Sequence, residues 1–123
     1  MVHLQKLWLN RNFIMVVEPL RALKKLNTLG LFHNEISNEN KAWEVFEDLT
    51  ALRDLSIDGN PVSAKASFKY ELIMRLRLLD TLDDEPIQEL DRDVAEQFFV
   101  QNRSKALLIN LLVPLPGQSA LKK

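Results

Sequence analysis

Side chains that could do chemistry are sparse in this chain of 123 residues, and their spacing suits neither catalysis nor metal binding. The two histidines, His3 and His33, have no second ligand at metal-binding spacing, so we expect solvated imidazoles. Four acids crowd between Asp80 and Glu85, but this run lacks the glycine and the distal glutamate of a calcium loop. We expect an exposed turn before a helix there, because carboxylates are stabilised near a helix N-terminus.

Other reactive groups are equally scarce. Cysteine is absent, so no disulfide, thiolate nucleophile or cysteine zinc site is possible. The three glycines are too scattered for a phosphate-binding loop, and no order of serine, histidine and aspartate suggests a triad. We therefore expect a protein without enzymatic activity and without a cofactor.

The charge balance narrows the choice of partners. Sixteen basic and seventeen acidic residues leave a formal net charge of −1, whereas a nucleic-acid surface normally shows a clustered basic excess. We expect no direct nucleic-acid binding. The longest apolar run, Ala106 to Val113, is far short of the roughly 18–20 residues needed to cross a bilayer, so no membrane insertion is expected. No secretion signal pattern is present at the start, and an intracellular, cytoplasmic setting is predicted.

The dominant pattern is the spacing Leu-x-x-Leu-x-x-Leu-x-Leu/Ile-x-x-Asn-x-Ile/Val, which occurs three times. Its asparagines, at positions 12, 34 and 60, lie 22 and 26 residues apart. Periods of about 20–29 residues with this signature are typical of leucine-rich repeats. The aliphatic positions are Met1, Leu4, Leu7, Leu9 and Ile14; Leu23, Leu26, Leu29, Leu31 and Ile36; and Leu49, Leu52, Leu55, Ile57 and Val62.

Each repeat is expected to contribute one short strand: Leu7 to Leu9, Leu29 to Leu31 and Leu55 to Ile57. Alternation along a strand sends the leucines into the core and the intervening residues to the opposite face. One repeat cannot bury its leucines alone, so the repeats stack into a parallel sheet with a shared core. The amides that follow the strands can satisfy backbone groups at a buried bend in their own and the adjacent repeat. We predict such a structural ladder from Asn12, Asn34 and Asn60.

The segments between the strands are predicted to form turns and helices behind the sheet. Met15 to Ala22 should form a helical turn. Residues 38–48 should form a longer helix, with Asn40 as its N-cap and with Trp43 and Phe46 packed behind the sheet. Ser63 is expected to cap a further helix that runs to about residue 75.

The C-terminal third is predicted to cover the end of the core. A degenerate repeat (Leu76, Leu79, Leu82) precedes a last helix that begins near Gln88, and together they would form a lid. The residues of that helix expected to face inward are Leu90, Val94 and Phe98. We therefore divide the chain into three repeats (1–62), the degenerate repeat and C-terminal cap (63–102) and a tail (103–123).

Two interpretations of the tail stay open. Leu107 to Leu112 could extend the last helix and fold back on exposed apolar surface, or the tail could be a disordered segment that binds a partner. We favour the first, because apolar patches seldom stay bare in soluble monomers.

The repeats resemble those of the protein-phosphatase regulatory-subunit type, a leucine-rich repeat group with ciliary, centrosomal and spliceosomal members. Asn60-Pro61-Val62, Tyr70-Glu71-Leu72-Ile73 and the run Leu76 to Asp83 look like the C-terminal capping motif of that group. Pro86-Ile87 and the run Asp91 to Glu96 are similar to ciliary members. The resemblance implies an α/β fold: a short right-handed solenoid with a parallel concave sheet, convex helices or turns and a C-terminal helical cap.

This chain departs from that group at its start, because Met1 begins inside a repeat and no N-terminal cap precedes it. Leu4, Leu7 and Trp8 would then belong to an uncovered edge strand, which invites pairing with another chain. Either the sequence is a fragment or short isoform, or self-association closes the edge.

Residues that point away from the core are the candidate contacts. The predicted partner-binding set is Lys6, Trp8, Asn10, Thr28, Phe32, Asp54, Ser56 and Asp58, with Gly30, Thr81 and Asp83 on the same face. Phe32 and Trp8 are candidate anchors, since rigid exposed aromatics offer large contact areas, although Trp8 could instead shield the open edge. Asp54 and Asp58, near Asp83, would suit a basic partner segment; solvated surface charge is the equal alternative.

We therefore predict a non-catalytic module that binds a protein segment across the concave strands. The resemblance implies a ciliary, cytoskeletal or phosphatase-scaffolding setting. The alternative is a ribonucleoprotein component that resembles the spliceosomal A-prime protein and touches RNA only through a partner.

Overall fold

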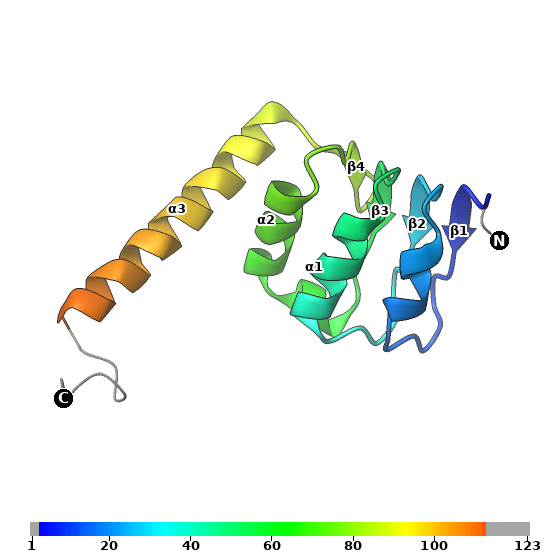
Figure 1. Ribbon diagram of the computed structural model, residues 1–123, viewed down its shortest axis with the longest axis horizontal. Helices are drawn as coiled ribbons and strands as arrows, with labels where there is room; N and C mark the ends of the chain where they lie inside the picture. Colours follow the sequence, from blue (N-terminus) through cyan, green and yellow to red (C-terminus); the bar gives the residue numbers. More distant parts are fainter. Residues whose placement is uncertain (1–2, 113–123) are drawn as a thin grey trace.

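A computed structural model describes the backbone of residues 3–112 and the side chains of residues 3–102. Five strands form one sheet in the order β1-β2-β3-β4-β5. Neighbouring strands from β1 to β4 are parallel, whereas β5 pairs antiparallel with β4. Figure 1 shows the strands side by side along one axis, with helices packed on one side of the sheet. The strands are β1 (Lys6–Trp8), β2 (Thr28–Gly30), β3 (Asp54–Ser56), β4 (Thr81–Leu82) and β5 (Glu85–Pro86).

The register places one leucine of each repeat in a single row: Leu7, Leu29, Leu55 and Leu82. Leu29 and Leu55 are buried, and Leu7 packs against the same core from the edge. This confirms the predicted parallel sheet with a shared leucine core. The strands begin and end one residue earlier than predicted, but their alternation is as expected.

The convex layer consists of two 3-10 turns and two helices (Figure 1). These are η1 (Glu18–Ala22), α1 (Glu39–Asp48), η2 (Pro61–Ala64) and α2 (Ala66–Arg75). Phe46 of α1 and Phe68 of α2 are fully buried, and the partly buried Trp43 stacks on Phe68 with ring centroids 5.8 Å apart. The predicted packing of Trp43 and Phe46 behind the sheet is confirmed.

Both predicted N-caps in this layer are wrong. Helix α1 is capped by Asn38 rather than Asn40, because Asn38 has extended backbone and its side chain accepts a hydrogen bond from the amide of Lys41 at 3.0 Å. Ser63 lies inside η2, where its hydroxyl exchanges hydrogen bonds with the backbone N–H (3.2 Å) and C=O (2.9 Å) of Asn60. This local pairing holds a 3-10 turn, so α2 begins only at Ala66.

Two members of the asparagine ladder are buried as predicted, with exposed fractions of 6% for Asn34 and 4% for Asn60. The Asn60 amide donates to the carbonyls of Leu31 and Ile57, both at 2.8 Å, and accepts from the amide of Ile36 at 3.1 Å. Asn34 makes the equivalent bonds one repeat earlier. Each amide therefore ties its own bend to the preceding repeat.

Asn12 is different, because it is exposed and donates only within its own bend, to the carbonyls of Leu9 and Asn10. The prediction of a buried, cross-repeat role is wrong for this position. In the described structure the ladder joins repeats only at Asn34 and Asn60.

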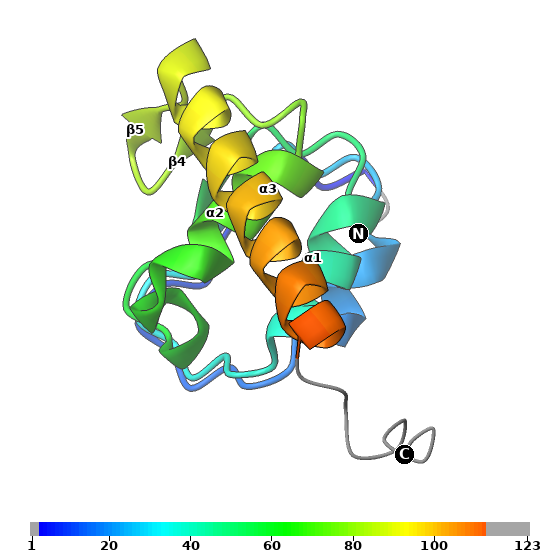
Figure 2. The same cartoon turned by 90° about the vertical axis from the view of Figure 1, so that its left-hand side faces the viewer.

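The C-terminal cap is a tight β4–β5 hairpin followed by the 24-residue helix α3 (Glu89–Leu112). Asp83 and Asp84 form the hairpin turn with left-handed φ angles of 52° and 66°. Figure 2 shows α3 crossing obliquely in front of α2. The helix begins where predicted, beside Gln88, whose amide donates to the Asp91 carboxylate at 2.8 Å.

The predicted inward stripe of α3 is wrong, because Leu90 and Val94 are 69% and 42% exposed. Ala95 is fully buried instead, and α3 packs against α2. Arg92 donates to the carbonyls of Ile73 and Leu79 at 2.9 and 2.6 Å, so this charged residue also lies on the packed side of the helix. Of the predicted stripe, only Phe98 packs on α2, against Tyr70 at 4.7 Å between ring centroids.

The backbone of α3 is helical through Leu112, so the predicted extension of the last helix is confirmed for residues 107–112. Whether that segment folds back concerns the side chains of residues 103–112, which lie outside the described part. Residues 113–123 of the predicted tail lie outside it entirely.

Candidate binding surface on the concave sheet face

Two rows of residues face away from the leucine core along the sheet. The strand register aligns Lys6, Thr28, Asp54 and Thr81 in one row. Trp8, Gly30 and Ser56 form the next row. Trp8 is 63% exposed. The outward positions expected from alternation therefore lie side by side on one face.

Gly30 makes room for its larger neighbours in the second row. A Cβ atom at this position would lie 2.9 Å from Asn10 Oδ1 and 3.0 Å from Trp8 Cδ1. The side chains of Trp8 and Asn10 thus lie across the backbone of β2. Because Gly30 has no side chain, the Trp8 side chain has room to lie over β2.

A hollow of about 190 Å³ opens in this face beside Trp8. It brings together five of the eight predicted contact residues and adds two acids from the β4–β5 turn. Lys6, Thr28 and Asp54 do not line it and lie in the neighbouring row of the sheet. The residues of this concave hollow are Trp8, Asn10, Phe32, Ser56, Asp58, Asp83 and Asp84.

A backbone hydrogen bond and two side-chain contacts position Phe32 on the aromatic side of the hollow. Asn10 Oδ1 accepts a hydrogen bond from the amide of Phe32 at 2.7 Å, which joins the first two repeats. The Phe32 ring lies 4.0 Å from that of His33, and the Arg11 guanidinium lies over Phe32, 5.6 Å from the ring centroid. His33 therefore packs on an aromatic ring, although its side chain is exposed as predicted.

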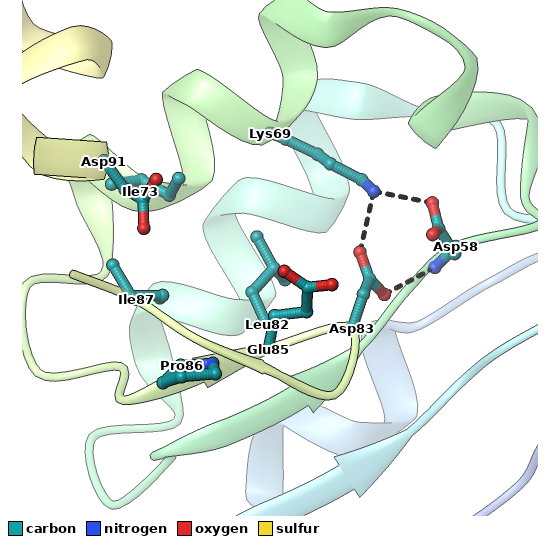
Figure 3. Close-up of a pocket in the computed structure, with 9 residues that line it drawn as sticks. All are labelled: Asp58, Lys69, Ile73, Leu82, Asp83, Glu85, Pro86, Ile87 and Asp91. Atoms are coloured by element: carbon teal, nitrogen blue, oxygen red, sulfur yellow. Dashed lines mark hydrogen bonds and ion pairs between the residues drawn. The ribbon is translucent and has the colours of Figure 1, made fainter.

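The acidic side of the hollow contains a partly buried ion-pair bridge, shown in Figure 3. Asp83 Oδ1 accepts from the amides of Ile57 and Asp58 at 2.7 and 2.9 Å. Lys69 Nζ lies 2.8 Å from Asp83 Oδ2 and 2.6 Å from Asp58 Oδ1. Burial favours the neutral form of Lys69, but hydrogen bonds and charge from both aspartates outweigh it and raise the pKa of this ammonium.

This bridge corrects one prediction and modifies another. The Asp83 side chain is only 12% exposed, so this part of the acidic run is not a solvated turn. Asp58 and Asp83 share the single Lys69 cation, so together they give the cap side one uncompensated negative charge and not two. Lys69 was not predicted as a site residue, because no sequence pattern around it on α2 indicates a contact with the strands.

Asp54 and Asp84 supply the remaining negative charge near the hollow. Partial burial, followed by the negative charge of Asp84, raises the pKa of the Asp54 carboxyl above its ordinary value, and the positive charge of Lys6 opposes this. Asp84 was not among the predicted contacts. Its place beside the predicted Asp83 in the hairpin turn was the available signal.

A second hollow of about 270 Å³ lies on the other side of the Lys69 bridge, between α2 and the β4–β5 hairpin (Figure 3). Ile73, Leu82 and Ile87 line it together with Glu85 and Asp91. Within residues 3–102, no three acids or histidines are grouped so that they could hold a metal ion. The described helices include none with the length and apolarity of a membrane span.

Stacked strand–turn units with a shared leucine core, an asparagine ladder and an open polar sheet face define a solenoid repeat protein. The chain belongs to the leucine-rich repeat family, whose model matches residues 1–111. This confirms the repeat type and α/β solenoid inferred from the spacing.

Curated relatives match over a small part of their own length. Dynein axonemal assembly factor 1 of Mus musculus is 36% identical over 81 residues, which is 65% of this chain and 13% of that protein. Centrosomal protein of 72 kDa of Mus musculus is 29% identical over 102 residues, or 82% of this chain and 16% of that protein. Leucine-rich repeat-containing protein 36 of Homo sapiens is 29% identical, with 80% and 13% covered.

Solved structures share the fold. The Drosophila melanogaster SNF/U2A′ complex contains a chain with a TM-score of 0.72 and 28% identity, covering 85% of this chain and 61% of that one. The Mex67 leucine-rich repeat domain of Chaetomium thermophilum has a TM-score of 0.60 and 26% identity, with 76% and 63% covered. This chain is thus similar to part of a dynein axonemal assembly factor and of a centrosomal protein, and to chains of the SNF/U2A′ complex and of the Mex67:Mtr2 subunits.

Proposed function

We propose that this chain is a non-catalytic interaction module that binds a protein segment across the concave face. The observation that supports the proposal most is the concave hollow, where an exposed tryptophan, a half-buried phenylalanine and acidic side chains meet on a rigid sheet. Aromatic side chains on rigid elements are common binding anchors, because they bury a large area at low entropic cost. The predicted contacts Lys6, Thr28 and Asp54 would flank the segment in the adjacent row.

The expected result of removing the anchor is a loss of partner binding without loss of the fold. Trp8→Ala should weaken retention of the partner by about tenfold or more, the scale of an interfacial hot spot. Gly30→Val should do the same by displacing Trp8 and Asn10. Quantitative affinity purification with the wild-type chain and each variant measures this.

Leu90→Ala is the matched control, because Leu90 is as exposed as Trp8 but lies on α3. Proteins retained by the wild type and by Leu90→Ala, but lost with Trp8→Ala and Gly30→Val, would support the concave site. A protein set that the concave substitutions leave unchanged would refute it.

The biological setting is a finer proposal. The relatives named for dynein axonemal assembly and for the centrosome favour a ciliary or cytoskeletal complex, in a cytoplasmic location, over a phosphatase-scaffolding one. The likeness to the SNF/U2A′ complex supports the second candidate, a ribonucleoprotein component that works through a protein partner. RNA that co-purifies and depends on Trp8 would favour the second candidate; its absence would favour the first.

We also propose that the β1 edge associates with a second copy of this chain. Among the described strands β1 has a neighbour on one side only, and Phe13, Met15 and Val16 beside it are strongly exposed. Sedimentation velocity over a concentration series should show dimer formation that Phe13→Ser combined with Met15→Ser suppresses. A monomer at every concentration would contradict this proposal and leave the concave site untouched.

A further inference from the structure

The charges on the concave face are not evenly distributed. Lys69 pairs with Asp58 and Asp83 at the cap end and compensates one of their two negative charges. Asp54 and Asp84 take part in no ion pair within the described part of the chain, and they lie close enough for Asp84 to raise the pKa of Asp54. The uncompensated negative charge of the face is therefore concentrated at β3 and the turn after β4.

The opposite end of the same face is cationic. Lys6 lies on β1, and Arg11 follows β1 with its guanidinium over the Phe32 ring. Neither cation forms an ion pair among residues 3–102, although Lys6 lies near enough to Asp54 to oppose the rise in its pKa. The strand order places β1 and β4 at opposite ends of the parallel part of the sheet, as Figure 1 shows. The aromatic residues lie toward the cationic end, since Trp8 is on β1 with Lys6 and Phe32 follows β2 beneath Arg11.

The acidic end is maintained at a cost to the folded chain. Because the pKa of Asp54 is higher in the folded than in the unfolded state, the folded protein holds its proton more tightly. The resulting penalty is absent below the unfolded-state pKa and fully present once the pH exceeds the folded-state pKa. At neutral pH the ionised Asp54 therefore opposes folding, whereas a partner cation placed beside it would remove the penalty.

We propose that the concave face selects a polarised segment: lysine or arginine over Asp54 and Asp84, apolar side chains against Trp8 and Phe32, and acids over Lys6 and Arg11. This inference rests on the proposed function and adds to it the chemistry and direction of the occupant. Strand spacings of about 4.8 Å place Lys6 on β1 about 10 Å from Asp54 on β3 and about 14 Å from β4, which precedes Asp84. In an α-helix, with its rise of about 1.5 Å per residue, these distances separate the basic and acidic groups by about six to nine residues.

Selection from a display library of random 16-residue peptides on the full chain tests the proposal. Peptides whose binding needs Trp8 should be enriched in lysine or arginine about six to nine residues from an acid. Their affinity should fall about tenfold for the double substitution Asp54→Asn with Asp84→Asn, and it should fall with added salt. Reversing these positions to lysine should restore the binding of peptides whose basic residues are changed to glutamate.

The control is Asp93→Asn, which removes an exposed acid on α3. Asp54→Asn is expected to be at least as stable as the wild type at neutral pH, so lost binding would not come from unfolding. Peptides that need Trp8 but ignore Asp54 and Asp84 would overturn this inference and leave the proposed function standing. A selection that yields only peptides insensitive to Trp8, or none, would count against both.

Discussion

Replacing Asn60 by alanine is expected to lower the free energy of unfolding by roughly 2–5 kcal/mol, since it orphans two buried backbone groups at about 1–3 kcal/mol each. These groups are the carbonyl of Ile57 and the amide of Ile36, whereas the Leu31 carbonyl keeps the Asn34 side chain as a donor. The lost bonds to Leu31 and Ile36 both join Asn60 to the preceding repeat, so the substitution also loosens the stacking of repeats. Urea unfolding at neutral pH, followed by circular dichroism, measures the loss.

The ladder contains its own control. Asn12→Ala removes two bonds within one exposed bend and should cost no more than about 1 kcal/mol. Asn34→Ala should fall between the two, because the carbonyls of Leu9 and Leu31 keep donors from other asparagines and only the Ile14 amide loses its acceptor. Equal losses at Asn12 and Asn60 would contradict a ladder that works through burial.

Asp83→Ala is expected to lower the free energy of unfolding by roughly 2–4 kcal/mol. At the ends of β1 and β2, Leu9 and Leu31 donate to backbone carbonyls of the next strand, Gly30 and Ser56. At the end of β3 the chain has already turned into the β4–β5 hairpin, and the Asp83 carboxylate accepts from Ile57 instead. Alanine would leave that amide and the Asp58 amide without acceptors, and Lys69 with one carboxylate fewer.

Asp83→Asn separates these two roles. The asparagine carbonyl can still accept from both amides, so it should lose only the charge interaction with Lys69 and cost less than half as much as alanine. Thermal and urea unfolding of the two variants at one pH give the comparison. Equal destabilisation by asparagine and alanine would show that the ion pair, and not the closure of the sheet end, is the main contribution.

The strands and the core could be predicted because the sequence within each repeat determines which residues form the strand and which are buried. The leucine spacing alone placed Leu29 and Leu55 in one buried row, and alternation placed Trp8 and Ser56 on the other face. The predicted strand limits were wrong by one residue, but the regular leucine spacing still assigned the inward and outward residues correctly. Repeat architecture makes such local inference reliable, since every unit contacts only its neighbours.

The packing of α3 in the C-terminal cap could not be predicted, because its contacts with α2 do not follow a repeating pattern in the sequence. An apolar stripe at Leu90 and Val94 has the right spacing for a buried helix face, but the buried residue is Ala95. Arg92 donates to the carbonyl groups of Ile73 and Leu79, and helical spacing does not reveal such hydrogen bonds. The face of α3 that packs therefore includes a charged residue, which a search for apolar spacing excludes.

The candidate site was predicted in its positions but not in its charges. Alternation identified five residues that now line one hollow, among them Trp8 and Phe32. The apparent acidity of Asp58 and Asp83 depended on a cation from another element, Lys69, which no local pattern connects to them. Counting charges residue by residue therefore overstated the free negative charge at Asp58 and missed the negative charge of Asp84.

The central claim, that a protein partner lies on the concave face, is tested most directly by site-specific photo-crosslinking. A photoreactive phenylalanine analogue at Phe32 is compared in cells with the same analogue at Val100, which is exposed on α3. The account predicts one dominant crosslinked protein from position 32 that Trp8→Ala abolishes, and little or none from position 100. Crosslinks from position 100 alone, or an unchanged yield with Trp8→Ala, would contradict it.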